Sequence, residues 1–239
     1  MIGLVTGSLF SKKPIGVGDM ISRKPNPQKL TPVPRAPREM LEFVSPKPRG
    51  PIEPSLQKMS LKGKIEMAVH EGLAIERYLD SVKVWTIGVG VTAMAGADIN
   101  PDTYTGRITI RHAIDMMEAI LPQYEAIAQN LLGPQSVPSH VFDALTSAAY
   151  NIGPRLARGQ QTRGLVEMGR YGEALMLWRR PAAIISRRKK EAKLADHGIY
   201  SGGTIGIWAG GVNGGRHRMI DRISADELAA MMEPSFKNT

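Results

Sequence analysis

The 239-residue chain is predicted to be an α+β protein, with a small β element beside a mostly helical lobe and an extended proline-rich arm in front. Three observations predict this fold class. Residues 1–60 hold 10 of the 17 prolines. Residues 77–92 are rich in β-branched residues and punctuated by glycine, whereas most of the chain from 60 to about 200 repeats apolar residues at helical spacing.

The proline-rich segment is predicted to be an extended arm without a core of its own. Each proline removes a backbone donor and disfavours helix in the residue before it, which leaves a polyproline-like chain. The arm is also basic, because residues 1–60 carry 10 Lys and Arg against 4 Asp and Glu, or +6 of the total +9. The predicted division is therefore an arm over 1–59, a compact domain over 60–200, and a Gly-rich connector with a short helix over 201–239.

Composition excludes several function classes. The chain has no cysteine, so disulfide frameworks, thiolate metal sites and cysteine nucleophiles are excluded. A net charge of +9 suits an anionic partner, such as nucleic acid, a phospholipid surface or a bacterial envelope, without choosing among them. Met1 to Phe10 is mildly apolar but short and lacks a preceding positive charge, so we expect neither a signal peptide nor stable membrane insertion.

The helical segments follow from caps and periodicity. Ser60 is a plausible N-cap for a helix that ends with Glu71, because Gly72 suits the position after a helix. Residues 77–92 form a hairpin or meander, and Thr109 caps a long helix that Pro122 kinks or ends. Further helices are expected at about 139–151, 162–168, 172–178 and 184–194. Gly202 to Gly215 is interpreted as a flexible connector, followed by a Ser224/Glu227 capping box that opens a helix through Met232.

The residues around the first helix end carry a family resemblance. The strings His70-Glu71-Gly72-Leu73, Tyr78-Leu79-Asp80 and Thr86-Ile87-Gly88-Val89-Gly90 resemble the signature of the phage-type lysozymes, a family of glycoside hydrolases. That signature is a Glu, a second acid nine residues on, and a Thr six beyond it. Later motifs resemble the family in the same order, namely 142–145, 150–153, 169–175 and Trp178 followed by 187–194. The resemblance covers roughly residues 60–200 and implies a lysozyme-like fold with its active-site cleft between the β element and the helical lobe.

The chemistry of glycoside hydrolysis needs two carboxyl groups in different environments. One must protonate the leaving oxygen, and the other must be ionised to activate water or to stabilise an oxocarbenium-like transition state. Glu71, flanked by Leu73 and Ile75, is expected to be partly shielded from water and to be the acid. Asp80 lies in a hairpin and should stay solvated and ionised, while the Thr86 hydroxyl can orient the attacking water. The resemblance implies inverting cleavage of the β-1,4 bond between N-acetylmuramic acid and N-acetylglucosamine, for which the carboxyl groups stand about 6.5–9.5 Å apart.

Each candidate residue also has a structural interpretation. An isolated Glu at the end of a helix is usually an ordinary surface acid. Only the presence of both Asp80 and Thr86 at the expected spacing favours a catalytic role for Glu71. The resemblance suggests that one arginine of the 187–188 pair reaches the cleft and pairs with Glu71 or with a saccharide carboxylate, and Arg188 is the predicted partner. Asn151 is predicted to be a helix C-cap that can also support substrate binding. Trp208 stacking on a sugar is an open alternative to a structural role.

The resemblance implies that peptidoglycan is the substrate and that the enzyme needs no cofactor and no metal. Two biological settings remain open. A virion-associated, bacteriolytic lysozyme would use residues 1–60 to bind other phage virion (tail) proteins and would act in the host periplasm and cell wall during entry. A free endolysin would instead collect in the host cytoplasm until a holin releases it. A third alternative is a structural virion protein with an inactive lysozyme fold. Nucleic-acid binding is not expected, because the arm lacks interleaved aromatic residues.

Overall fold

The computed structural model describes residues 57–81, 83–211 and 217–233. The chain divides into two units, Met1–Pro48 and Arg49–Thr239, and every described residue belongs to the second. The predicted arm over 1–59 lies outside the described residues except for its last three positions.

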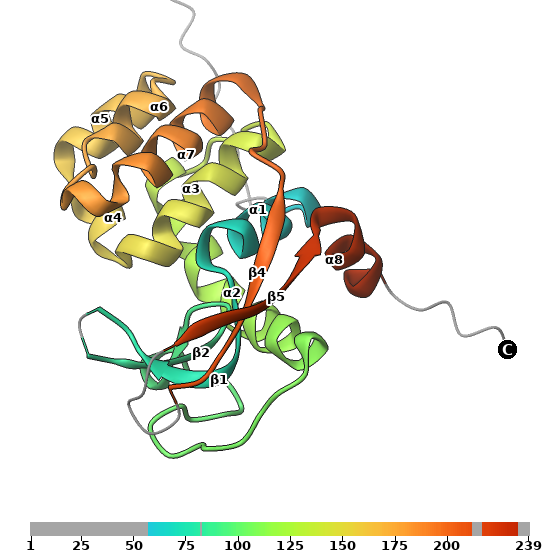
Figure 1. The fold of residues 1–239 in the computed structure, drawn as a ribbon. Coiled ribbons are helices and arrows are strands. Elements are labelled where there is room, and N and C mark those ends of the chain that lie inside the picture. The colour runs from blue at the N-terminus through green and yellow to red at the C-terminus, as the bar shows by residue number, and fades with distance from the viewer. Residues whose placement is uncertain (1–56, 82, 212–216, 234–239) are drawn as a thin grey trace, which may run out of the picture. The chain divides into compact units, whose positions relative to one another are not determined.

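The described elements run from α1 to α8 along the chain (Figure 1). The first half contains α1 (Leu61–Glu71), β1 (Leu73–Leu79), β2 (Trp85–Gly88), β3 (Val91–Thr92), a 3-10 turn (Ala93–Ala95) and α2 (Ile110–Leu132). The second half contains α3 (Ser139–Ile152), α4 (Arg155–Arg158), α5 (Gln160–Glu167), α6 (Tyr171–Met176), a 3-10 turn (Ala182–Ile184), α7 (Ile185–His197), β4 (Thr204–Ala209), β5 (Arg218–Ser224) and α8 (Ala225–Met232). This mixed content confirms the predicted α+β class.

The strands form one sheet in the order β3-β2-β1-β4-β5. The pairs β1–β2, β2–β3 and β4–β5 are antiparallel, whereas β1 and β4 are parallel, with Leu73 opposite Ile207 and Ala74 opposite Trp208. The interpretation of Gly202 to Gly215 as a flexible connector is therefore wrong for residues 204–209. These residues alternate buried and partly exposed positions, and Ile205, Ile207 and Ala209 enter the core beneath the sheet.

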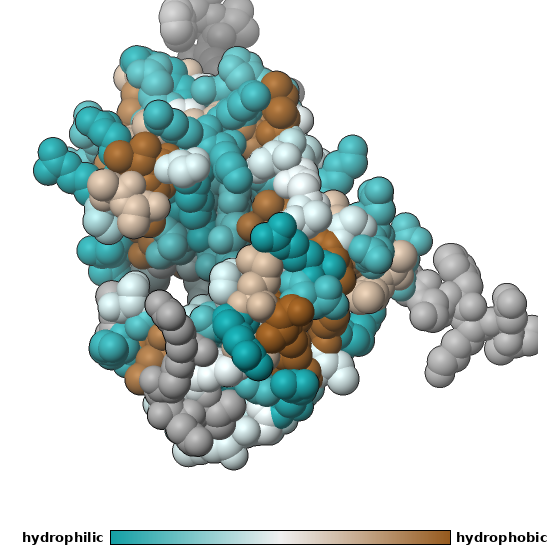
Figure 2. All heavy atoms as spheres, viewed as in Figure 1, coloured by the Kyte–Doolittle hydropathy of each residue, from teal (hydrophilic) through white to brown (hydrophobic). Residues whose placement is uncertain are grey.

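The core has two parts, and α2 passes through both. One cluster gathers the inner face of the sheet, α1, α8 and the first half of α2. The other gathers the second half of α2 with α3 to α7, around residues such as Phe142 and Leu145. Figure 1 shows the helical lobe, α3 to α7, at one end and the sheet at the other. Figure 2 shows that the face in view is hollowed between them.

Most predicted helix ends are confirmed by their caps. The Ser60 hydroxyl accepts from the Gly63 amide at 3.1 Å, and the Thr109 hydroxyl accepts from the His112 amide at 3.0 Å. The capping box at Ser224 is also present. Of the two outcomes predicted for Pro122, a helix end is wrong, because α2 continues past it to Leu132. A proline fixes a φ angle that a helix accepts, and the buried side chains on both sides keep the segment helical.

The folded unit begins before α1. Met59 is buried in the sheet-side core, and its backbone amide donates to the Glu125 carboxylate at 2.8 Å. The Gln57 side chain donates to the Val137 carbonyl at 2.7 Å. Residues 57–59 are therefore attached to α2 and to the segment before α3. Within the described ranges, no helix is both long and apolar enough to cross a bilayer.

Candidate active site

Glu71 is placed by the abrupt end of α1. It is the last helical residue, and Gly72 follows with a φ of +73°, which turns the chain from α1 directly into β1. Glycine is needed here for two reasons. The left-handed region is strained for residues with a Cβ, and a Cβ at this position would lie 2.9 Å from Nε1 of Trp208. The tight turn leaves the Glu71 side chain 21% exposed.

Arg187 of α7 is the principal charged partner of Glu71. Its Nη1 donates to Oε1 of Glu71, its Nε donates to Oε1 of Glu191 at 2.9 Å, and its Nη2 donates to the Ser147 carbonyl at 3.2 Å. Burial by itself lowers the pKa of Arg187, but the carboxylates of Glu71 and Glu191 outweigh burial and raise this pKa above its usual value. Arg187 is therefore a fixed cation that ties Glu71 to the helical lobe.

The choice of Arg188 as the partner of Glu71 is wrong. Arg188 is fully buried, with its Nη1 2.6 Å from Oε2 of Glu191 and its Nη2 donating to Oδ1 of Asn151 at 2.8 Å. Consecutive residues of a helix point about 100° apart, so only one of the two arginines can face the sheet. The lysines that follow, Lys189, Lys190 and Lys193, are exposed.

Asn151 lies in the last turn of α3, and the C-cap is Gly153 rather than Asn151. The Asn151 side chain accepts from Arg188, and the residue is exposed. This contact fixes the last turn of α3 against α7. Substrate binding by Asn151 stays a prediction.

Asp80 and Thr86 lie at the turn end of the β1–β2 hairpin. The Asp80 carboxylate accepts from the Val84 amide at 2.8 Å, and the Asp80 amide donates to the Val84 carbonyl at 3.0 Å. These two bonds close the turn and fix the direction of the carboxylate. Thr86 lies opposite Tyr78 in the ladder, is 4% exposed, and donates its hydroxyl to the Val84 carbonyl at 3.3 Å.

Tyr78 connects the two predicted catalytic acids. Burial, followed by the nearby charges of Glu71 and Asp80, raises its pKa to about 12. Tyr78 therefore lies within electrostatic reach of both carboxylates, and it lines the same cavity as Glu71. A second tyrosine, Tyr150, donates its hydroxyl to the Val89 carbonyl at 2.5 Å and so holds the loop after β2 against α3.

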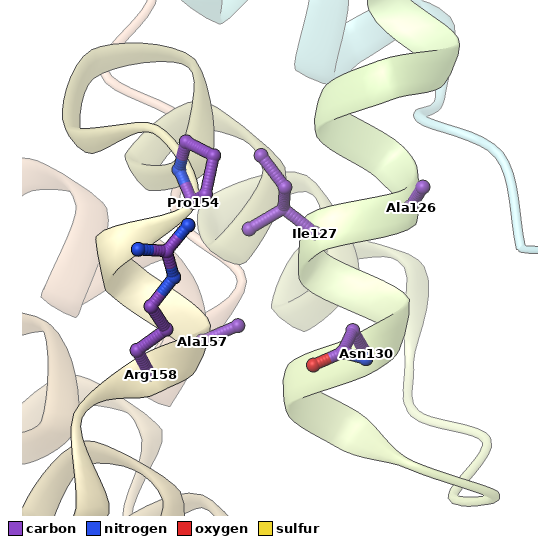
Figure 3. Close-up of a pocket in the computed structure, with 6 residues that line it drawn as sticks. All are labelled: Ala126, Ile127, Asn130, Pro154, Ala157 and Arg158. Carbon is purple, nitrogen blue, oxygen red and sulfur yellow. The ribbon is translucent and has the colours of Figure 1, made fainter.

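A cavity of about 400 Å³ opens beside Glu71. Its lining comes from the end of α1 and from β1, β4 and β5: Val69, His70, Glu71, Gly72, Tyr78, Gly206, Trp208, His217 and Met219. A different hollow of about 300 Å³ lies between α2 and α4, where Ile127 points toward Pro154 and Arg158 (Figure 3). No predicted catalytic residue lines that second hollow. Within the described ranges, no three His, Asp or Glu residues gather as a metal site would require.

The comparison with protein families decides the assignment. The sequence profile described as phage lysozyme matches residues 68–191, slightly more than half of the chain, and this range includes Glu71, Asp80, Thr86 and Arg187. The chain belongs to the phage lysozyme family. It is accordingly a glycoside hydrolase and a peptidoglycan-degrading lysozyme.

Solved structures agree with this fold. The endolysin from the Escherichia coli O157:H7 phage FAHEc1 is 26% identical, with a TM-score of 0.51, over 60% of this chain and 96% of that one. The muramidase domain of SpmX from Asticaccaulis excentricus is 24% identical, with a TM-score of 0.50, over 59% of this chain and 98% of that one. A search of curated proteins gives no match.

Sequence reasoning missed three features of this lysozyme site. It chose the wrong arginine, because periodicity along residues 184–194 does not fix the rotation of the helix within one residue. It gave Tyr78 no role of its own. It also missed the wall formed by β4 and β5, although the alternation of Ile205, Ile207 and Ala209 with smaller or amphipathic residues is a strand signal.

Proposed function

We propose that this lysozyme is a bacteriophage N-acetylmuramidase that hydrolyses the β-1,4 bond between N-acetylmuramic acid and N-acetylglucosamine. Glu71 is the general acid, and Asp80 and Thr86 activate and position the water. The observation that carries the proposal is the arrangement at the junction of α1 and β1. There Glu71 ends α1, is anchored by Arg187 and lines the same cavity as Tyr78, and β1 leads on to Asp80, whose carboxylate is anchored by the Val84 amide.

The proposed roles follow from the two environments. Glu71 is a quarter or less exposed and faces a cavity, so its carboxyl group can approach a glycosidic oxygen with little competing water. Arg187 is a positioning residue, since its hydrogen bond to Oε1 of Glu71 fixes the orientation of the whole carboxyl group. Asp80 lies in the partly exposed turn after β1, and its carboxylate can stabilise the positive charge that develops on the sugar ring.

The test of this proposal is the identity of the products. Purified peptidoglycan is digested with the full chain, and the new reducing ends are converted with borohydride and analysed. We expect reduced N-acetylmuramic acid ends from the wild type and a loss of about 10²–10⁴-fold in rate for Glu71→Gln, the usual contribution of a general acid. New reducing ends on N-acetylglucosamine would contradict the muramidase assignment.

We further propose that this lysozyme is carried by the virion and acts on the host wall during entry. The support is the uneven charge, because residues 1–60 carry +6 of the total +9 and precede the family segment, which begins at 68. Such a basic, proline-rich segment suits binding to other phage virion (tail) proteins. A free endolysin, released by a holin, is the competing setting.

The two settings differ in where the protein is found. Mass spectrometry of purified virions should detect the chain, and its absence there would reject the entry role. A deletion of residues 1–56 should retain lysozyme activity, because Gln57 is the first described residue bonded to the domain. The same deletion should abolish incorporation into virions. A deletion extended through Met59 is a poor test, since it removes a buried core residue.

A further inference from the structure

The β4–β5 hairpin is built into the lysozyme fold although it follows the family segment, which ends at residue 191. β4 pairs in parallel with β1, and Ile205, Ile207 and Ile223 contribute to the sheet-side core. Two carboxylates bind the chain on either side of β4: Glu66, which lies just before the family segment, and Glu76, which lies within it. Glu66 accepts from the Ser201 amide at 2.9 Å, and Glu76 accepts from the Gly210 amide at 2.6 Å. The hairpin is therefore held at a fixed position beside β1.

The outer face of this hairpin is aromatic. Because Ile205, Ile207 and Ala209 point into the core, Gly206 and Trp208 lie on the opposite face. The rings there form a continuous stack, since His217 lies 4.0 Å from Tyr78 at an interplanar angle of 5°, and 5.0 Å from Trp208 at 26°. A glycine is required at 206, because a Cβ there would lie 2.8 Å from Nε1 of the indole.

This aromatic stack and the proposed acid share one cavity. Glu71, Tyr78, Trp208 and His217 all line the hollow of about 400 Å³, a size within the range of ligand pockets. The Nε1 edge of Trp208 lies against Gly72, the residue next to Glu71. The cavity also holds an unsatisfied polar group, because Nε2 of His217 is buried without a hydrogen-bond partner among the described residues.

We propose that Trp208, His217 and Tyr78 form a sugar-binding wall that holds one N-acetylhexosamine ring of the glycan strand next to Glu71. This inference rests on the proposed muramidase function and extends it to residues outside the family segment. A pyranose ring offers an apolar C–H face that suits an aromatic surface, and its hydroxyl or acetamido groups can satisfy the unpartnered Nε2 of His217. The wall makes Trp208 and His217 specificity residues of this chain.

The competing explanation is purely structural. Trp208 packs against Gly72, and in that role it would only support the turn that positions Glu71. The two explanations predict different kinetics. A wall that contacts the glycan equally in the ground state and the transition state changes KM and leaves kcat nearly constant, whereas a misplaced acid lowers kcat.

The direct test is binding to chitotetraose, the soluble β-1,4 tetramer of N-acetylglucosamine, measured by calorimetry. The full chain carries Glu71→Gln so that the probe stays intact. In this parent, Trp208→Ala should raise Kd roughly tenfold, and Trp208→Phe, which keeps a ring, about twofold. The matched control is Trp85→Ala. Trp85 is also a half-buried strand tryptophan of the sheet, but it lies beneath the Arg77 guanidinium and does not line the cavity.

Each outcome decides the proposal. A Kd for Trp208→Ala within about twofold of the parent overturns it, as does a failure of the parent to bind chitotetraose, because the wall needs only the ring and its N-acetyl group. If Trp208→Ala does not fold, the change in tryptophan fluorescence of the parent on binding chitotetraose is measured instead. The proposal expects this change to come from Trp208, so an equal change in Trp208→Phe overturns it.

The kinetic arm keeps this inference separate from the proposed function. With Glu71 intact, Trp208→Ala should raise KM for soluble glycan strands roughly tenfold at nearly constant kcat. A fall in kcat at constant KM supports the structural explanation and overturns the wall. Full activity of Glu71→Gln would instead defeat the acid assignment, while the chitotetraose comparison would still decide the role of Trp208.

Discussion

Replacing Arg187 with Met is expected to destabilise the protein strongly, because it leaves buried carboxylates without their shared cation. Arg187 is 12% exposed, Glu191 is fully buried, and Glu71 is 21% exposed. Removing one partner of a buried ion pair costs about 3–5 kcal/mol. Glu191 keeps its hydrogen bond from Ser147 at 2.7 Å and its contact with Arg188 at 2.6 Å, so the lower end, about 3 kcal/mol, is expected.

The assay is thermal unfolding followed by circular dichroism at neutral pH. For a chain of this length, about 3 kcal/mol corresponds to a fall in Tm of roughly 6–12 °C. The matched control is Arg170→Met. Arg170, like Arg187, makes two hydrogen bonds to glutamate, here both to Glu173 at 2.7 and 2.6 Å. Because this pair lies on the exposed surface, its loss should leave Tm nearly unchanged. Equal Tm values for the two variants would refute the assignment of Arg187 as a buried anchor.

Three further predictions concern the residues around Glu71. Asp80→Asn keeps the hydrogen bond from the Val84 amide and removes only the charge, so turnover of peptidoglycan should fall about 10²–10⁴-fold at unchanged Tm; a small effect would exclude Asp80 from catalysis. Burial, with the charges of Arg187, Lys190 and Arg188, lowers the pKa of His70 to about 3. In the unfolded chain His70 has its ordinary pKa of about 6.5, so below that pH the unfolded state binds more protons than the folded state. The contribution of neutral His70 to the free energy of unfolding is therefore complete above about pH 6.5 and is lost as the pH falls toward about 3. Unfolding titrations should show a slope of up to about 1.4 kcal/mol per pH unit in this window that His70→Gln reduces, and identical slopes would contradict it. Gly72→Ala should lower the free energy of unfolding by about 1–3 kcal/mol in urea titrations, and by more than Gly96→Ala, which shares the positive φ but has no atom within 4 Å of the added Cβ. Equal losses of unfolding free energy in the two variants would show that the clash between the added Cβ and Trp208 does not destabilise the protein.

Local signals predicted the first half of the site well. Ser60 and Gly72 define α1 through their own backbone and side-chain chemistry, and they place Glu71 at the helix end without reference to the rest of the chain. The hairpin that carries Asp80 and Thr86 was likewise visible in β-branched residues and glycine. Such short-range features survive folding because each depends on neighbours within a few residues.

The second half of the site depends on tertiary contacts that sequence patterns do not contain. Whether Arg187 or Arg188 faces Glu71 depends on how α7 rotates against α3, where Ser147 and Glu191 meet in the core. The parallel pairing of β4 with β1 joins segments more than 130 residues apart. The many glycines around Ile205 and Ile207 indicated a connector and so weakened the strand signal of their alternation. The wall at Trp208 could be recognised only once that pairing placed it beside Gly72.

The central claim is that Glu71 donates the proton that breaks the glycosidic bond. Its most direct test is the initial rate of peptidoglycan solubilisation by Glu71→Gln, with Glu118→Gln as the control. Glu118 is another partly exposed glutamate in an ion pair, with Lys64 at 2.6 Å, and lies outside the cavity. The structure predicts a loss of about 10²–10⁴-fold for Glu71→Gln with its circular dichroism spectrum retained, and a wild-type rate for Glu118→Gln. A folded Glu71→Gln variant with undiminished turnover would contradict the claim.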